Sequence, residues 1–98
     1  MKQKLKEAID ELLPTVKELI PINLVLHEIK VEDADSDIFD SRDVAAITDI
    51  EFDARCARIY INEDHHYWKK EDWEATLFGV LLQRVNQICL LDMSKLMQ

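Results

Sequence analysis

The sequence predicts an α+β fold, in which a small, mainly antiparallel three-stranded sheet packs against an N-terminal helix and a long C-terminal helix. Three observations lead to this prediction. Apolar residues recur at helical spacing over residues 5–20 and again over 73–89. Between these segments, β-branched and apolar residues form shorter runs of the kind found in strands. With 98 residues and no linker or repeat, the chain is expected to form a single domain, residues 1–98.

The first helix is predicted by an amphipathic pattern that stops at Pro21. Pro14 interrupts this pattern, because proline removes one backbone donor and crowds the preceding turn. Two outcomes fit the sequence: a helix that kinks at residues 13–14, or one helix followed by a short second one. The apolar face consists of Leu5, Ala8, Ile9, Leu12, Leu13, Val16, Leu19 and Ile20.

Three segments are predicted to form strands. Residues 22–31 are rich in β-branched and apolar types, and residues 46–52 and 56–61 fit a hairpin around a turn at 53–55. Alternation along the hairpin places apolar side chains on one face and acids on the other. The side chains predicted to be buried are Ile50, Phe52, Ile59 and Ile61, and the acids predicted on the opposite face are Asp49, Glu51 and Asp53.

A long helix is predicted from near Glu71 to about Leu90. Its apolar stripe is wider than one small sheet needs, so a homodimer in which this helix pairs with its copy is one hypothesis. Gly79 is the only glycine and lies inside this helix, where glycine costs roughly 1 kcal/mol relative to alanine. We expect close approach by Trp68, Trp73 or a second subunit's helix to explain it. The residues predicted for packing or an oligomer contact are Phe78, Gly79, Leu82 and Val85.

The net charge of −8 comes entirely from one contiguous segment. Residues 28–53 contain ten acids and two bases, whereas the rest of the chain contains ten of each. Such a field repels nucleic acid and anionic membranes and attracts basic surfaces. We therefore predict a basic surface of another protein as partner, with no direct binding to nucleic acid or membranes. The predicted partner-binding residues are Glu32, Asp33, Asp35, Asp37, Asp40, Asp43, Asp49, Glu51 and Asp53.

The leading hypothesis from the sequence is a non-catalytic binding module that docks this acidic surface onto its partner. A nucleic-acid-processing protein is a natural target, because its phosphate-binding groove is lined with Lys and Arg. A small inhibitor that imitates nucleic acid, of the kind that occurs in phages and mobile elements, would have this size and acidity. Two explanations compete with it: an acidic face that only prevents aggregation, and a homo-oligomeric assembly protein that uses the C-terminal helix.

The acidic segment begins like a calcium loop but does not continue like one. Asp33, Asp35 and Asp37 have the alternating spacing of the first three calcium ligands. The same pattern requires glycine at its sixth position and glutamate at its twelfth, where this chain has Ile38 and Val44. We therefore predict an exposed anionic loop without a specific calcium site.

We predict no catalytic residues, metal site or cofactor. The chain has no Gly-rich phosphate loop and no nucleophile motif. Cys56 and Cys89 lack CxxC spacing and are expected to be structural thiols of a cytoplasmic protein. No apolar run is long enough to span a membrane, and the charged N-terminus lacks the core of a signal peptide. A metal site at Asp64, His65 and His66 is the weakest alternative, because adjacent histidines rarely face one ion.

One stretch resembles a known family in its layout. Residues 57–88 read ARIYINEDHHYWKKEDWEATLFGVLLQRVNQI, in which a strand and a short polar loop lead into a helix. This layout is similar to that of zincin-like metallopeptidases, whose helix carries the HExxH motif. At the corresponding positions Gly79 and Gln83 replace the two histidines, and Val80 replaces the glutamate that acts as general base. The resemblance therefore implies a remnant of a metal-dependent hydrolase, in which the fold is retained and the peptidase chemistry is lost.

Overall fold

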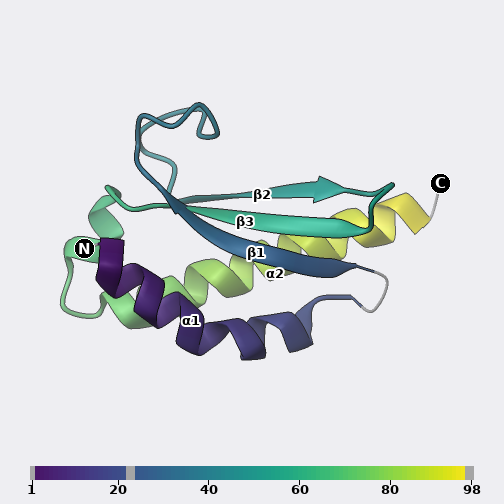
Figure 1. Ribbon diagram of the computed structural model, residues 1–98, viewed down its shortest axis with the longest axis horizontal. Helices are drawn as coiled ribbons and strands as arrows, with labels where there is room; N and C mark the ends of the chain where they lie inside the picture. Colours follow the sequence, from purple (N-terminus) through teal and green to yellow (C-terminus); the bar gives the residue numbers. More distant parts are fainter. Residues whose placement is uncertain (1, 22–23, 97–98) are drawn as a thin grey trace.

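The computed structural model of the protein describes residues 2–21 and 24–96, and it has the predicted α+β architecture. The three strands form one sheet, and both helices pack on the same face of it, α1 along β1 and α2 along β2 (Figure 1). The elements are α1 (Lys2–Leu19), β1 (Val25–Glu32), β2 (Ala46–Glu51), β3 (Cys56–Asn62), the short 3-10 helix η1 (His66–Lys69) and α2 (Trp73–Leu96).

The sheet is mixed, with the strand order β1-β3-β2. The central strand β3 pairs antiparallel with β2 through the predicted hairpin and parallel with β1. One of the two strand pairs therefore differs from the mainly antiparallel sheet that was expected. The physical reason lies in burial: Ala57, Ile59 and Ile61 of β3 are fully buried, whereas the acidic β2 is half-exposed along most of its length. The most apolar strand takes the centre, and the acidic strand lies at an edge.

The core lies between the sheet and the two helices. Cross-strand partners share a face, so Ile59 lies between Ile29 of β1 and Thr48 of β2 on the side of the helices. Of the four hairpin side chains predicted to be buried, two are fully buried and two, Ile50 and Phe52, are half-buried. The helices contribute the fully buried side chains Leu5, Val16, Leu77, Leu81 and Ile88.

Both helices differ from the prediction: α1 is continuous where a break or kink was expected, and α2 is longer than predicted. α1 continues through Pro14 as a single α-helix, and Pro14 lies on its exposed side, where the carbonyl left without a donor can be hydrated. α2 begins at Trp73 and continues to Leu96, beyond the predicted end near Leu90. Within residues 2–21 and 24–96, neither helix combines the length and the apolar content that a membrane span requires. The start of the first predicted strand, residues 22–23, lies outside the described residues.

Candidate functional site

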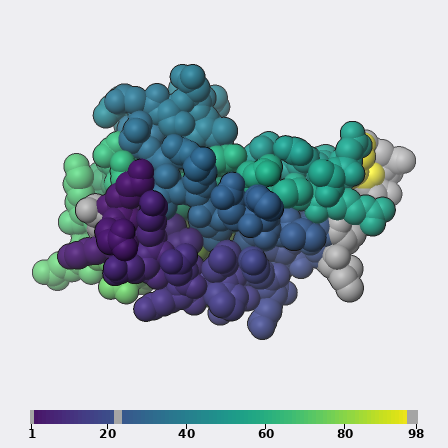
Figure 2. Space-filling model, viewed as in Figure 1, coloured from purple at the N-terminus to yellow at the C-terminus, as the bar shows by residue number. Residues whose placement is uncertain are grey.

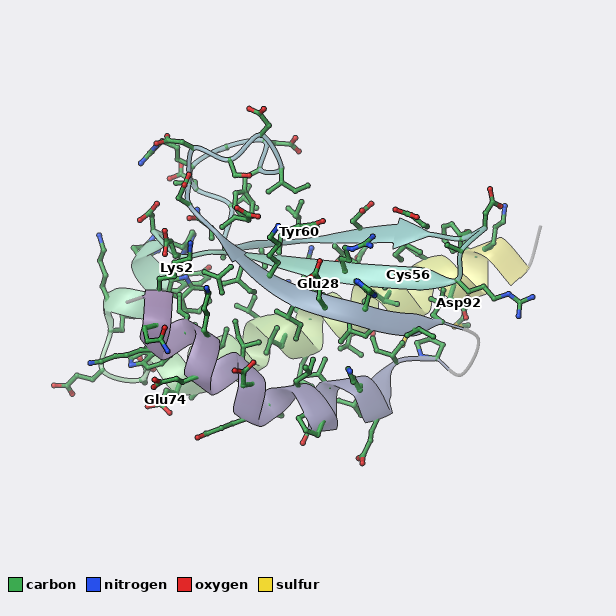
Figure 3. All side chains as sticks on the ribbon, in the orientation of Figure 1. Lys2, Glu28, Cys56, Tyr60, Glu74 and Asp92 are labelled. Carbon is green, nitrogen blue, oxygen red and sulfur yellow. The ribbon has the colours of Figure 1, made fainter. Side chains whose placement is uncertain are left out.

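The acidic loop, residues 33–45 between β1 and β2, is the most prominent feature of the surface. It rises above the sheet at the end of the molecule that also carries η1 (Figure 1), and it forms a separate protrusion in the space-filling view (Figure 2). Carboxylate oxygens extend from it into solvent (Figure 3). Five of the predicted partner-binding acids lie in this loop, and all are exposed: Asp33, Asp35, Asp37, Asp40 and Asp43.

The acidic loop is folded rather than extended. Ala34 and Phe39 are 6% and 7% exposed, so two apolar side chains of the loop are buried. Three turns close its backbone, each with an N–H that donates to the carbonyl oxygen three residues earlier: Ser36 to Asp33, Phe39 to Ser36, and Val44 to Ser41. The five aspartates are therefore attached to a backbone with a defined shape.

Polar residues at the end of β3 and just after it anchor the base of the acidic loop. Asn62 is fully buried, and its Nδ2 donates to the carbonyl oxygens of Arg42 and Val44 at 3.1 and 3.0 Å. Its Oδ1 accepts from the backbone N–H of Asp64 at 3.0 Å. Asp64 Oδ2 in turn accepts from the backbone N–H of Ala34 at 2.9 Å. These bonds connect the last residue of the central strand to both ends of the loop.

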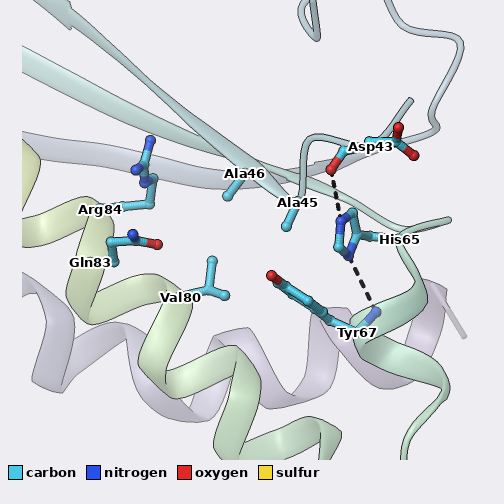
Figure 4. A pocket seen from close by; sticks show the side chains of 8 residues that line it. All are labelled: Asp43, Ala45, Ala46, His65, Tyr67, Val80, Gln83 and Arg84. Carbon is cyan, nitrogen blue, oxygen red and sulfur yellow. Dashed lines mark hydrogen bonds between the residues drawn. The ribbon is translucent and has the colours of Figure 1, made fainter. Parts of the chain in front are cut away.

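His65 supplies a further anchor and is only 4% exposed. Its Nδ1 accepts from the backbone N–H of Tyr67 at 3.2 Å, so the proton of the neutral ring lies on Nε2. Nε2 donates to the carbonyl oxygen of Asp43 at 2.8 Å (Figure 4). Burial lowers the pKa of His65 below its ordinary value of 6.5; the hydrogen bond to Asp43 opposes this shift, and the nearby His66 adds to it. The geometry and the pKa both favour a neutral, structural imidazole.

The same contacts bear on the weakest sequence-based alternative, a metal site at Asp64, His65 and His66. The Asp64 carboxylate and both ring nitrogens of His65 already have backbone partners, and His66 is exposed. Across the part of the chain that the structure describes, no group of three or more His, Cys, Asp or Glu side chains is placed to hold a metal ion. Asp64 and His65, in the segment after β3, thus use these polar atoms in hydrogen bonds to the backbone, including that of the acidic loop.

Four predicted partner-binding acids lie outside the acidic loop and are dispersed: Glu32, Asp49, Glu51 and Asp53. Glu32 forms an ion pair with Lys30, and Glu51 forms one with Arg58, both at 3.3 Å. Asp53 lies in the turn between β2 and β3, separated from the loop by the length of β2. The structure therefore gathers five of the nine predicted acids into one compact site and leaves Asp53 at the other end of the sheet.

The four residues predicted for packing or an oligomer contact do not form one surface. Val85 is 6% exposed and packs in the chain's own core, so it cannot reach a second subunit, and Phe78 is half-buried. Leu82 is exposed. Gly79 is also exposed, and no described heavy atom outside its own helix turn lies within 4 Å of the position that its Cβ would take. The expected approach of a tryptophan to Gly79 is therefore wrong.

Other large apolar side chains are exposed at the end of the molecule opposite the acidic loop. They lie at the C-terminal end of α2 and at the adjacent end of α1 and start of β1, and the thiol of Cys89 lies 3.9 Å from the carbonyl oxygen of Leu19. We call this group of side chains the apolar end, and it consists of Leu19, Val25, Leu90, Leu91 and Met93.

A cavity of 190 Å³ lies between the start of β2, η1 and the middle of α2 (Figure 4). Sequence reasoning did not identify it, because its walls come from segments that are far apart in the chain. Asn62 was missed for a similar reason: its buried amide is part of a polar run that resembles an ordinary loop. Comparison with known proteins finds no matching family model, no similar curated protein and no similar solved structure.

Proposed function

We propose that this chain is a non-catalytic protein-binding module that presents the acidic loop to a basic surface of another protein. The observation that carries this proposal is the anchoring of the loop. A loop that serves only solubility needs exposed charges but no fixed backbone. Here the buried side chains of Asn62 and His65, together with the exposed carboxylate of Asp64, bond to the loop backbone, and Phe39 of the loop is itself buried.

The charges of the acidic loop also remain available to a partner. Among the described residues, Asp35 is the one loop aspartate that forms an ion pair, with Arg42. The carboxylates of Asp37, Asp40 and Asp43 have no cationic partner within residues 2–21 and 24–96. Closely spaced like charges raise the local field and therefore favour association with Lys and Arg on another molecule.

A protein that binds nucleic acid is the partner class that this surface fits best. Its phosphate-binding groove offers several cations in a row, and a protruding loop of fixed shape with five aspartates can enter such a groove. Binding of this kind would block access of nucleic acid, so the proposal includes an inhibitory role that imitates nucleic acid.

The first test compares partner capture by the wild type with capture by a loop variant. In this variant Asp33, Asp35, Asp37, Asp40 and Asp43 are all changed to asparagine. We expect the wild type to capture a nucleic-acid-binding protein from nuclease-treated lysate, with capture decreasing as salt rises and as duplex DNA is added. The loop variant should capture much less of the same protein.

A matched control separates the site from the net charge. Changing five exposed helical acids to their amides alters the net charge by the same amount; suitable residues are Glu7, Asp10, Glu11, Glu18 and Glu74. This control should capture the partner almost as well as the wild type. Equal loss in both variants would mean that only net charge matters, and equal capture by all three proteins would contradict the proposal.

A second variant tests the shape of the loop without changing its charge. Asn62→Ala removes both hydrogen bonds to the loop carbonyls and leaves every aspartate in place. We expect weaker partner capture at unchanged net charge, with circular dichroism used to verify that the domain still folds. Undiminished capture by a folded Asn62→Ala protein would show that the anchoring has no role in recognition.

A homodimer that uses the apolar end is the second candidate function. The apolar end is exposed and lies at the far end of the 41 Å long axis from the acidic loop. A second copy could therefore bury its own apolar end there with the two acidic loops held far apart, and a symmetric contact needs only one self-complementary surface. Sedimentation at micromolar concentration should detect a dimer that Leu90→Glu with Met93→Glu abolishes, and a monomeric wild type would contradict this candidate.

A further inference from the structure

The cavity beside the acidic loop combines an apolar wall with a polar one. It has a volume of 190 Å³ and lies below the start of β2 (Figure 4). The apolar wall is formed by Ala45, Ala46 and Val80. The polar wall is formed by Asp43, His65, Tyr67, Gln83 and Arg84. Cavities of this kind, with a few convergent polar groups, are typical of binding sites for small molecules.

Three polar groups of this wall lack partners within the described chain. In Figure 4 the Tyr67 hydroxyl points into the cavity and the Gln83 amide is directed toward it, while Arg84 lies at its edge. Across residues 2–21 and 24–96, no hydrogen bond or ion pair occupies the hydroxyl, the amide or the guanidinium. All three groups can donate hydrogen bonds, so together they suit a ligand that accepts them.

Arg84 determines the charge of such a ligand. It is half-buried, and unlike Arg42 and Arg58 it has no carboxylate partner among the described residues. Asp43 belongs to the cavity wall, but its carboxylate points away from the cavity in Figure 4. A guanidinium that is partly removed from water is stabilised by an anion, which it can bind through two parallel hydrogen bonds.

We propose that this cavity binds a small carboxylate that carries a short aliphatic group. One guanidinium and two neutral donors match a planar, singly charged carboxylate, whereas a phosphate would bring more negative charge to a chain of net charge −8. The carboxylate lies against Arg84, and the aliphatic group lies against Ala45 and Val80. This proposal does not depend on the protein-binding function proposed for the acidic loop, although Asp43 and Ala45 belong to both the loop and the cavity wall.

The volume of the cavity sets the size of the ligand. The volume is many times the roughly 10–15 Å³ that one water molecule needs on the same measure, which leaves room for a chain of a few carbon atoms. Sites for drug-sized ligands are larger, at about 300–1,000 Å³. Two sources carry a carboxylate of this size: a free short-chain acid and the C-terminal residue of a peptide.

The test follows amide NMR spectra of the isotope-labelled full chain during titration with three probes. These are valerate, its neutral analogue valeramide, and an N-acetylated dipeptide of alanine and valine with a free carboxylate. We expect saturable shifts at Ala45, Ala46 and Val80 at millimolar concentrations of the carboxylates, and none with valeramide. Tighter binding of the dipeptide would identify a peptide C-terminus as the source, and tighter binding of valerate would identify a free acid. Equal shifts with valeramide, or no saturable shifts with either carboxylate, would overturn the proposal without any variant.

Two variants and a control locate the binding site. Arg84→Gln should weaken valerate binding by at least about tenfold, because it removes a charge-assisted pair. Ala45→Leu should abolish binding by filling the cavity. Arg55→Gln removes an exposed arginine in the turn after β2 and should leave binding unchanged. Spectral dispersion verifies that each variant is folded, and unchanged affinity in folded Arg84→Gln would contradict the proposed role of Arg84.

Discussion

At the level of single residues, the shape of the acidic loop depends on polar side chains that are themselves buried. Asn62 uses both its donor and acceptor atoms in bonds to the backbone. Its position at the end of the central strand keeps those bonds away from water. Each such buried hydrogen bond contributes about 1 kcal/mol to stability, and a buried donor or acceptor left without a partner costs more than that. His65 acts in the same way, but its ability to donate and accept depends on its protonation state.

Titration of His65 should make the stability of the domain depend on pH. Its pKa in the folded protein lies below 6.5, the ordinary value that applies when the chain is unfolded. As pH falls below about 6.5, the unfolded chain therefore binds the proton first, and the free energy of unfolding decreases until pH passes the folded pKa. In the neutral ring Nδ1 accepts a hydrogen bond from the N–H of Tyr67. Protonation places a hydrogen on Nδ1, so this hydrogen bond is lost. Asp43 faces the ring with its carbonyl oxygen, and His66 is the neighbouring titratable group that lowers the pKa of His65.

Urea unfolding between about pH 7.5 and pH 5 measures this effect. His65→Gln keeps a side-chain donor but does not titrate, so its stability should change less over this range than that of the wild type. His27→Gln is the matched control and should retain the wild-type dependence, because His27 is exposed on β1 and is not among the groups that shift the pKa of His65. Parallel curves for the wild type and His65→Gln would show that His65 does not control the pH dependence.

Sequence reasoning found the charged residues of the candidate site but not the residues that position them. Asp33, Asp35 and Asp37 stand out because of charge density and spacing alone. Asn62 and His65 belong to a polar run between a strand and a helix, and such a run is typical of a solvated loop. Their burial follows from where the acidic loop folds back over the end of β3, which is a long-range contact that no local pattern encodes.

At the level of elements, periodicity predicted the helices and the hairpin, and the sheet order depended on packing. The pattern in 46–61 is local, because the turn at 53–55 joins adjacent antiparallel strands. The parallel pairing of β1 with β3 joins segments that are distant in sequence, and it arises because the most apolar strand is covered best at the centre. The width of the apolar stripe of α2 is explained in part by its burial against both β2 and α1.

Gly79 is the element-scale feature whose effect on stability can be tested directly. It lies inside α2, has no positive φ, and leaves open space where a Cβ would lie. Gly79→Ala should therefore raise the free energy of unfolding by about 1 kcal/mol, since alanine restricts the unfolded chain and favours the helix. Urea unfolding measures this gain. Ala75→Gly, at another exposed position of the same helix, is the reverse control and should lower stability by a similar amount.

Partner capture by Gly79→Ala then addresses why a glycine is present. A stabilised variant that captures its partner normally would show that Gly79 has no role in recognition. Loss of stability would contradict the open space that surrounds this position in the structure. A stabilised protein with weaker capture would indicate that another molecule's backbone packs at Gly79.

At the level of the whole molecule, the separation of charge from apolar surface gives the two ends different properties. The acidic loop carries uncompensated negative charge, while the apolar end carries exposed leucine and methionine side chains. The ion pairs that do form are exposed or half-exposed and contribute little, about 0–1 kcal/mol each. We therefore expect repulsion among the acids of residues 28–53 to be the larger electrostatic effect on the folded state.

Raising the ionic strength should accordingly stabilise the fold. Increasing NaCl from about 20 mM to about 0.5 M shortens the screening length from roughly 20 Å to a few ångströms, so repulsion within the acidic loop weakens. We expect the wild-type Tm to rise with salt, and the loop variant with five asparagines to have a higher Tm at low salt and a smaller rise. The control with five neutralised helical acids should respond to salt nearly as the wild type does, since its loop is intact. A wild-type Tm that falls with salt would mean that the ion pairs of Arg42 and Arg58 stabilise the fold by more than the repulsion among the acids destabilises it. Electrostatic attraction would then make the larger contribution to the stability of the folded protein.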